Sequence, residues 1–308
     1  MRLVILQNYA RFVTWSHSVF ALPFALLGAF LAETARAAEA SRAASPVSAW
    51  RFVAELAMVV LAMVAARSAA MAFNRIVDVR FDASNPRTAG RPLVTGQVAV
   101  RGAWFFFAAS AACFFASSSA FLVFGNPWPI ALAAPVLGVL CGYSLAKRFT
   151  AWCHIWLGVS LGMSPLAAWV AISPGTFGLL PVMLGAAVTC WVAGFDMIYA
   201  LQDVTVDRRL GLRSIPVAVG PVRALRISRA LHVAAIAGLL TVGLLAPPLG
   251  RLYYIAVALA AVLVWIQQSR VRPNDVSRVH STFFLYNGVV SLLIGAAGIA
   301  DMACRFAL

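Results

Sequence analysis

The sequence is poor in charged residues, and above all in acidic ones. Of its 308 residues 11% are charged, whereas a soluble globular chain of this length carries about a quarter. Ten residues are acidic, one is a lysine, and 62% of the chain is hydrophobic. The length alone would suggest about two soluble domains. Long apolar stretches recur from end to end, however, so we expect a single membrane-embedded domain over residues 1–308.

Patterns that indicate disulfide frameworks, metal-binding cysteines or common soluble cofactors are also missing. The five cysteines include no C-x-x-C pair and lie mostly in or beside apolar runs, which is typical of small buried side chains. There is no nucleotide-binding glycine loop, no catalytic triad motif and no haem motif. The function therefore has to be sought in the few polar residues of an apolar chain.

The sequence instead contains nine apolar runs, each near the twenty residues that a helix needs to cross the hydrocarbon core. They cover residues 12–32, 52–73, 102–124, 128–146, 154–172, 177–200, 228–246, 252–267 and 282–301. The first run is longer than the core of a secretory signal, so we interpret it as a retained span. The prediction is an all-α, polytopic membrane protein with nine transmembrane helices.

Basic residues give this bundle an orientation. With the N-terminus in the cytoplasm, eighteen of the 24 basic residues fall on the cytoplasmic side, five fall outside, and Arg67 lies within a span. This asymmetry follows the positive-inside rule and places the C-terminus outside. The net charge of +14 therefore reflects topology, and no nucleic-acid partner is expected. We expect a protein of the bacterial inner (cytoplasmic) membrane, with a site that opens to the cytoplasm.

Half of the acidic residues fall into two short windows, 74–82 and 196–207, each at the cytoplasmic end of a predicted span. Asn74, Asp78 and Asp82 are spaced by four, and Asp196, Asp203 and Asp207 by seven and four. These spacings place each set along one helix face. A carboxylate within a span costs about 2.5–3.5 kcal/mol, so acids gathered in this way need a cation.

An ordinary lattice of ion pairs with neighbouring arginines would satisfy either window alone. Two windows in matching positions, each followed by a basic loop with Gly and Pro, instead suggest two half-sites that face each other across a cavity. Ligands that offer only oxygen favour Mg²⁺, which takes one or two carboxylates together with water and phosphate oxygens. With the surplus of arginines, the pattern indicates a diphosphate substrate.

These residues resemble the motifs of the UbiA family of intramembrane prenyltransferases. Residues 74–82, followed by Asn85 to Leu93, look like the first Asp-rich motif of the family, and residues 196–207, followed by Gly211 to Pro216, look like the second. Between them, residues 143–150 resemble the basic loop after the fourth span and include the single lysine, Lys147. The resemblance extends from about Phe20 to Gly220.

The resemblance implies a nine-helix bundle with a lateral opening toward the lipid and two Mg²⁺ ions that bridge a polyprenyl diphosphate. By position, the first ion would be held by Asn74, Asp78 and Asp82, and the second by Asp203 and Asp207. The diphosphate would contact Lys147 and Arg67, with Arg75 and Arg213 as further candidates. The apolar tail would lie between helices or in membrane lipid.

The second substrate would be an aromatic acceptor. Arg148 would lie near its carboxylate, and Asp196, two turns deeper than Asp203, would orient or deprotonate its hydroxyl. Arg75 stands where many relatives have an acid, and Val204 to Val206 replace further acids, as in the 4-hydroxybenzoate polyprenyltransferase-like branch. We therefore expect Mg²⁺-dependent prenylation of 4-hydroxybenzoate for ubiquinone. Prenylation of a dihydroxynaphthoate for menaquinone by the futalosine route remains open.

Alternatives from other classes fit less well. A cation-coupled transporter would place its ion site near the bilayer midplane, whereas both acidic windows lie at span ends among arginines. An alcohol phosphatidyltransferase would carry a D-G-x-x-A-R pattern, which is absent. His17 and His154 lie near the cytoplasmic ends of spans and are interpreted as helix-end or interfacial histidines rather than catalytic ones. Gly158 and Gly162 form a G-x-x-x-G, which predicts close helix packing within the bundle.

Overall fold

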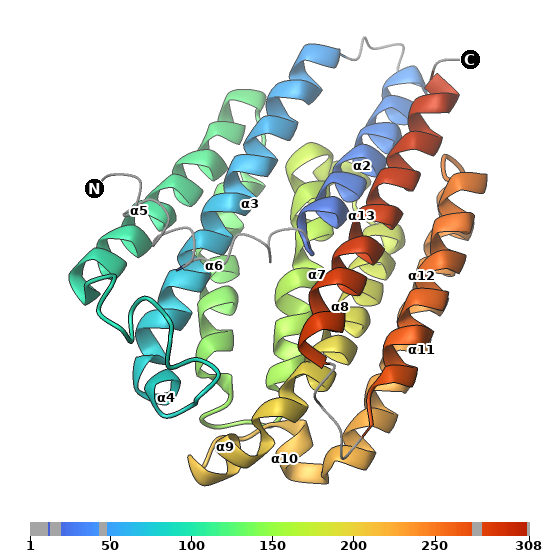
Figure 1. The fold of residues 1–308 in the computed structure, drawn as a ribbon. Coiled ribbons are helices and arrows are strands. Elements are labelled where there is room, and N and C mark those ends of the chain that lie inside the picture. Colours follow the sequence, from blue (N-terminus) through green and yellow to red (C-terminus); the bar gives the residue numbers. More distant parts are fainter. Residues whose placement is uncertain (1–11, 13–19, 43–47, 273–278, 307–308) are drawn as a thin grey trace.

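The computed structural model describes residue 12 and residues 20–42, 48–272 and 279–306, and this part of the chain contains helices and no β-strand. The helices are α2 (Leu22–Arg42), α3 (Ala49–Val77), α4 (Val79–Ala83), α5 (Val100–Ser119), η2 (Ala120–Phe124), α6 (Trp128–Ala146), α7 (Cys153–Ile172), η3 (Pro174–Thr176), α8 (Leu179–Ala200), η4 (Leu201–Asp203), α9 (Val204–Arg209), α10 (Ile215–Val219), α11 (Pro221–Leu245), α12 (Arg251–Arg270) and α13 (Val279–Phe306). The long helices stand side by side, and α4, α9 and α10 gather at one end of the bundle, which we name the site end (Figure 1).

The protein is an integral membrane protein by the length and apolarity of these helices. Within the described residues, eight stretches are long and apolar enough to cross a bilayer: 49–77, 100–124, 128–146, 153–172, 179–209, 221–245, 251–270 and 285–304. Helix α2 is not among them, because its second half carries Glu33, Arg36, Glu39 and Arg42. Residues 13–19 of the first predicted span lie outside the described residues, so the count of nine spans stays a prediction.

The predicted spans match the helices well where apolar residues run without interruption. The span at 128–146 is confirmed to the residue by α6, and those at 154–172 and 177–200 to within two residues by α7 and α8. The first predicted span, 12–32, differs most: α2 begins at Leu22, after a turn at residues 20–21, and continues to Arg42. Helix α11 begins at Pro221 rather than 228, and the other limits differ by five residues or fewer. Both extensions contain arginines, which suggest a loop in the sequence. Arg42, Arg223 and Arg226 are exposed on their helices, whereas Arg36 is half-buried and paired with Glu33 and Glu55.

Helices α7 and α8 pack with their backbones in contact, as the G-x-x-x-G pattern predicted. A Cβ atom on Gly158 would collide with the backbone oxygen of Thr189, and one on Gly162 would meet the Gly185 oxygen at 2.5 Å. Only glycine allows this approach, so close packing within the bundle is confirmed. The contact fixes the relative height of two helices that carry residues of the functional site at their ends.

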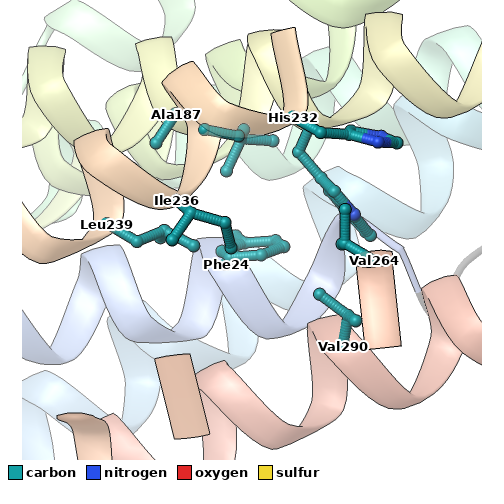
Figure 2. A pocket seen from close by; sticks show the side chains of 10 residues that line it. Phe24, Ala187, His232, Ile236, Leu239, Val264 and Val290 are labelled. Carbon is teal, nitrogen blue, oxygen red and sulfur yellow. The ribbon is translucent and has the colours of Figure 1, made fainter. Parts of the chain in front are cut away.

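The main hydrophobic core lies among α2, α7, α8, α11, α12 and α13. Figure 2 shows Phe24 of α2 beside Ile236 and Leu239 of α11, at a cavity of only about 10 Å³ that His232 also lines. A space of this size holds at most about one water molecule. This half of the molecule is therefore filled by side chains, and the large cavity described below lies elsewhere.

An acidic residue also connects two helices at the other end of the bundle. The Asp301 carboxylate of α13 accepts hydrogen bonds from the backbone N–H groups of Gly250 and Tyr253, both at 2.8 Å, at the start of α12. These N–H groups have no partner within their own helix, and a carboxylate there is stabilised by the helix dipole. Asp301 thus has a structural role that its position in the sequence did not reveal.

Candidate active site

A cavity of about 730 Å³ extends from the site end into the half of the bundle formed by α3, α5, α6, α7 and α8. Its deep wall is apolar and includes Val59, Phe114 and Phe121. Five carboxylates also line the cavity, those of Asp78, Asp82, Asp203 and Asp207 at its mouth and that of Asp196 deeper inside. The cavity therefore has one polar end and one long apolar end, a shape suited to a molecule with a charged head and a hydrocarbon tail.

The first acidic window surrounds a break between α3 and α4. Asp78 ends α3, where its backbone N–H donates to the Asn74 carbonyl at 3.0 Å, and its carboxylate accepts from Asn74 Nδ2 at 2.9 Å. Arg148 donates to the same carboxylate at 3.2 Å and to the Val77 carbonyl at 2.6 Å. Burial raises the pKa of Asp78 above its ordinary value, although the Arg148 hydrogen bond opposes this. The spacing predicted one continuous helix face, whereas the helix is interrupted at Asp78.

Asp82, one turn further, is paired with an arginine from the following loop. Arg91 Nη1 lies 2.6 Å from both carboxylate oxygens of Asp82. Successive turns hold this loop in shape, with Thr88 donating to the Asp82 carbonyl at 2.9 Å. The loop of the first motif therefore neutralises an acid of the same motif.

The same loop also reaches across the cavity mouth to the second motif. Arg87 Nη2 donates to Asp203 Oδ2 at 2.6 Å, and its Nε donates to Asp203 Oδ1 at 3.1 Å. Asn85 Nδ2 adds a third hydrogen bond to Asp203 at 3.0 Å, and the Arg87 guanidinium lies over the ring of Tyr199. Burial opposes the charge of Arg87, but Asp203 outweighs it and raises the pKa of the arginine. The two motifs therefore meet, as two half-sites should.

Asp207 is paired with the basic loop between α6 and α7. Lys147 Nζ donates to Asp207 Oδ2 at 2.9 Å, and the Lys147 carbonyl accepts from the backbone N–H of Arg213 at 2.7 Å. Burial disfavours a charged amine, but the Asp207 carboxylate raises the pKa of Lys147 above its ordinary value. The single lysine of the chain is thus a charged group held at the cavity mouth.

Asp196 lies deeper and is paired differently. Its Oδ2 lies 2.6 Å from Nδ1 of His154 in α7, and the histidine side chain is fully buried. His154 lies at the start of α7, so the expected helix-end position is confirmed, but it is buried against α8 and is not interfacial. The neighbours of a histidine in space cannot be read from its distance to the end of a span.

Ten of the eleven predicted site residues line the one cavity. They are Arg67, Asn74, Arg75, Asp78, Asp82, Lys147, Arg148, Asp196, Asp203 and Asp207. Arg213 does not line it, because its side chain donates to the Phe149 carbonyl at 2.8 Å at the protein surface. Arg75 is buried and donates to the Phe12 carbonyl at 3.4 Å. Its role, like those of the others, stays a prediction.

The sequence analysis missed three side chains that contact the acids. Asn85, Arg87 and Arg91 all belong to the loop quoted for the resemblance, but their partners were not foreseen. The arginine-rich composition of this loop was the available signal. Which acid each arginine reaches depends on the turns between Asn85 and Val98, and turns of that kind are set by tertiary structure.

The oxygen donors fit Mg²⁺ only with ligands from a substrate. Among the described residues no group of three or more His, Cys, Asp and Glu side chains is close enough to hold a metal ion. Asn74 with Asp78, and Asp203 with Asp207, each offer a few oxygens at the edge of a shared cavity. Mg²⁺ commonly takes one or two carboxylates and completes its shell with water and phosphate oxygens. The donor set therefore fits this ion together with a diphosphate.

Comparison with known proteins identifies the family of this chain. A model of the UbiA prenyltransferase family matches residues 21–288. The 4-hydroxybenzoate octaprenyltransferase of Nitrosospira multiformis is 31% identical over 255 residues, which cover 82% of this chain and 84% of that protein. The protein of the same name from Pseudomonas aeruginosa is 30% identical over 256 residues, covering 81% and 82%.

Solved structures show the same architecture. A UbiA homolog from Aeropyrum pernix superposes with a TM-score of 0.78 at 36% identity and covers 93% of this chain and 98% of its own. A UbiA homolog from Archaeoglobus fulgidus bound to DMAPP and Mg²⁺ has a TM-score of 0.68 at 21% identity, covering 96% and 99%, which is a likeness of fold alone.

Proposed function

Since the chain belongs to the UbiA prenyltransferase family, we propose that this prenyltransferase moves a polyprenyl chain from polyprenyl diphosphate to the aromatic ring of 4-hydroxybenzoate, with Mg²⁺ as cofactor. The observation that carries the proposal is the pairing of Arg87 with Asp203 across the mouth of an apolar cavity. That contact brings both acidic motifs to one charged end of one chamber.

The polar end suits the diphosphate. When bound, Mg²⁺ supplies positive charge that stabilises the diphosphate as its bond to the allylic carbon breaks. Lys147 and Arg67 also line the cavity and add further positive charge. Arg75 is a third candidate, whereas no contact in the structure supports the predicted role of Arg213. In this proposal the amide oxygen of Asn74 and the carboxylates of Asp78 and Asp82 would hold one metal ion, and the carboxylates of Asp203 and Asp207 would hold the other.

The apolar end suits the prenyl chain and the chemistry of its cation. An allylic cation must meet the ring carbon before it meets water, so a chamber walled by apolar side chains protects it. Leu132 and Phe177 line the chamber and are both exposed. A long chain can therefore leave the chamber sideways toward lipid.

The acceptor is placed between Arg148 and Asp196. Arg148 at the mouth carries the charge that an acceptor carboxylate needs, and Asp196 deeper in the cavity accepts a hydrogen bond from the acceptor hydroxyl. A dihydroxynaphthoate offers the same two groups, so it remains the alternative acceptor, with a product for menaquinone rather than ubiquinone. Membership of a prenyltransferase family favours the transferase over the cation-coupled transporter.

The proposed setting is the bacterial inner membrane. The site end carries Arg208, Arg209 and Arg213, with Arg223 and Arg226 exposed on the first turns of α11. By the positive-inside rule this end faces the cytoplasm. With nine spans, the N-terminus lies inside and the C-terminus outside, and diphosphate and acceptor enter from the cytoplasm.

The test is a competition between acceptors. Membranes that contain the protein are incubated with Mg²⁺, a polyprenyl diphosphate and equal amounts of 4-hydroxybenzoate and dihydroxynaphthoate, and their lipids are analysed by mass spectrometry. Membranes with the Asp78→Ala variant give the background. Prenylated hydroxybenzoate supports the proposal, prenylated naphthoate replaces the acceptor, and the absence of both products from folded protein contradicts it.

A further inference from the structure

Asp196 differs from the other carboxylates at the cavity in its partner. Among the described residues that line the cavity, Asp78, Asp82, Asp203 and Asp207 are each paired with arginine or lysine, whereas Asp196 is paired with His154. Arginine and lysine hold a permanent charge, but an imidazole donates a directed hydrogen bond whether neutral or charged. In the proposed function the four other acids act on the metal and the diphosphate head group of the donor, and Asp196 does not.

His154 is buried, and of its two ring nitrogens Nδ1 makes the contact with Asp196. Its side chain has no exposed surface, whereas the Asp196 side chain is 16% exposed, and both residues line the cavity. His154 Nε2 is buried and has no hydrogen-bond partner among the described residues. A buried ring nitrogen without a partner destabilises the fold. A side chain with only a packing role would be apolar, which suggests that the Nδ1 hydrogen bond compensates in function.

The helix pair holds this contact rigidly. His154 lies one turn from Gly158, where α7 touches Thr189 of α8, and Asp196 lies two turns further along α8. Because the two backbones cannot approach or slide without a collision, the 2.6 Å distance between the ring nitrogen and the carboxylate is fixed by packing. Such rigidity is what a positioned catalytic group requires.

We propose that His154 is a positioning residue, which holds the carboxylate of Asp196 in the orientation that receives the hydroxyl of the aromatic acceptor. The inference rests on the proposed function. In the reaction, the C–O bond of the donor breaks and its electron pair leaves with the diphosphate. A C–C bond forms at a ring carbon, and the proton of that carbon is released to water or to the diphosphate. Asp196 accepts a hydrogen bond from the hydroxyl, which increases the electron density of the ring.

In this proposal the two carboxylate oxygens of Asp196 have different partners. The bond from His154 Nδ1–H occupies Oδ2, so Oδ1 is left to face the acceptor. It also keeps the carboxylate from turning toward the cations at the mouth, where it would add to the charge of the metal site. Without the histidine, Asp196 would still be present but would sample orientations that miss the hydroxyl.

The test compares substitutions at one position by steady-state kinetics with each substrate varied in turn. His154→Leu removes the donor, and we expect kcat/KM for the acceptor to fall about 10–100-fold while KM for the prenyl diphosphate changes by less than about twofold. His154→Asn keeps an N–H donor near the position of Nδ1 and should restore most of the activity. His154→Gln places its amide near Nε2 instead and should not.

A double variant separates positioning from folding. If His154 acts through Asp196, then His154→Leu combined with Asp196→Asn should be no slower than Asp196→Asn alone. His232→Leu is the matched control, since His232 is an equally buried histidine outside the cavity, beside the small core cavity of Figure 2. It should leave both KM values unchanged.

Failure of this inference and failure of the proposed function would give different results. Equal kcat/KM for the acceptor in wild-type and His154→Leu protein would overturn the inference and leave the proposed function intact. So would equal losses for donor and acceptor, or equal activity of the Asn and Gln variants, which carry the test if the Leu variant does not fold. A wild-type protein that prenylates no aromatic acceptor would overturn the proposed function and this inference with it.

Discussion

Two groups of buried ion pairs lie at opposite ends of the bundle, and only one of them borders a cavity. At the site end, the site cluster consists of Asp78, Asp82, Asp203 and Asp207 with their basic partners. At the other end, the opposite-end cluster consists of Glu33, Arg36, Arg51 and Glu55. None of its members lines the large cavity. Buried acids with basic partners are therefore not in themselves a sign of an active site.

The chemistry of the two clusters explains the difference. Glu55 is 1% exposed and accepts from Arg36 and Arg51, each at 2.7 Å, while both arginines also donate to backbone carbonyls. That cluster connects α2, α3, η2 and α7, and its shared acid Glu55 has almost no exposed surface for a ligand. The site cluster has acids that each keep an edge on the cavity, so a metal ion and a diphosphate can replace side chains as partners.

Removal of Mg²⁺ should have the largest effect, because it should abolish the activity that depends on the site cluster and leave the stability of the protein unchanged. With excess chelator we expect no detectable transfer, because the diphosphate loses the charge that stabilises its departure. The thermal stability of the ligand-free protein should not change, because its acids are paired with side chains. Product formation by mass spectrometry and a melting curve with and without chelator provide the two measurements. Persistent turnover in chelator would contradict the diphosphate mechanism.

Loss of a single acid from the site cluster should have the next largest effect. We expect Asp203→Ala or Asp78→Ala to reduce kcat by about 1,000-fold or more, because several kcal/mol of transition-state stabilisation are lost. Insertion into the membrane should be unaffected. Initial rates on purified protein, with size-exclusion profiles as a folding control, check this. Robust activity in either variant would refute the assignment of these residues to the metal.

The match between the predicted spans and the observed helices shows what the spacing of residues in a sequence can and cannot specify. Uninterrupted apolar runs predict helices such as α6 to the residue, because the hydrocarbon core sets their length. The charged extensions of α2 and α11 were missed, since arginines and glutamates on an exposed helix face have the composition of a loop. Such helix ends are stabilised by contacts between side chains one turn apart, such as the ion pair between Arg36 and Glu33.

The residues of the site also divide into a part that the sequence predicts and a part that it does not. Acids recurring every four or seven residues define a face, so their convergence on one cavity was predictable. The partners of those acids were not, because Arg87 reaches Asp203 over 116 positions of sequence and His154 reaches Asp196 over 42. Such contacts are set by how loops turn and how α7 packs on α8. Local spacing carries no information about either.

Removal of a cation from the cavity mouth should have a smaller, selective effect. Arg148→Ala should raise KM for the acceptor about 10–100-fold, since a hydrogen bond between charged groups contributes about 1.5–3 kcal/mol. KM for the prenyl diphosphate should change much less. Arg226→Ala is the control, because Arg226 is an exposed arginine of α11 outside the cavity. The reverse pattern, a larger effect on the donor, would reassign Arg148 to the diphosphate.

A change in the opposite-end cluster should leave activity intact and affect stability alone. Glu55→Gln keeps the size of the side chain but removes the charge that Arg36 and Arg51 share, so we expect unfolding to become easier by about 1.5–3 kcal/mol. Neither kcat nor either KM should change, since Glu55 borders no part of the cavity. Thermal unfolding in detergent and the transfer assay measure the two quantities on one preparation. If kcat fell while the melting temperature held, the opposite-end cluster would have a function of its own, and the distinction drawn from the cavity would fail. If both held, the two arginines must be satisfied by the Ile172 and Phe124 carbonyls, and the Glu55 charge would be dispensable.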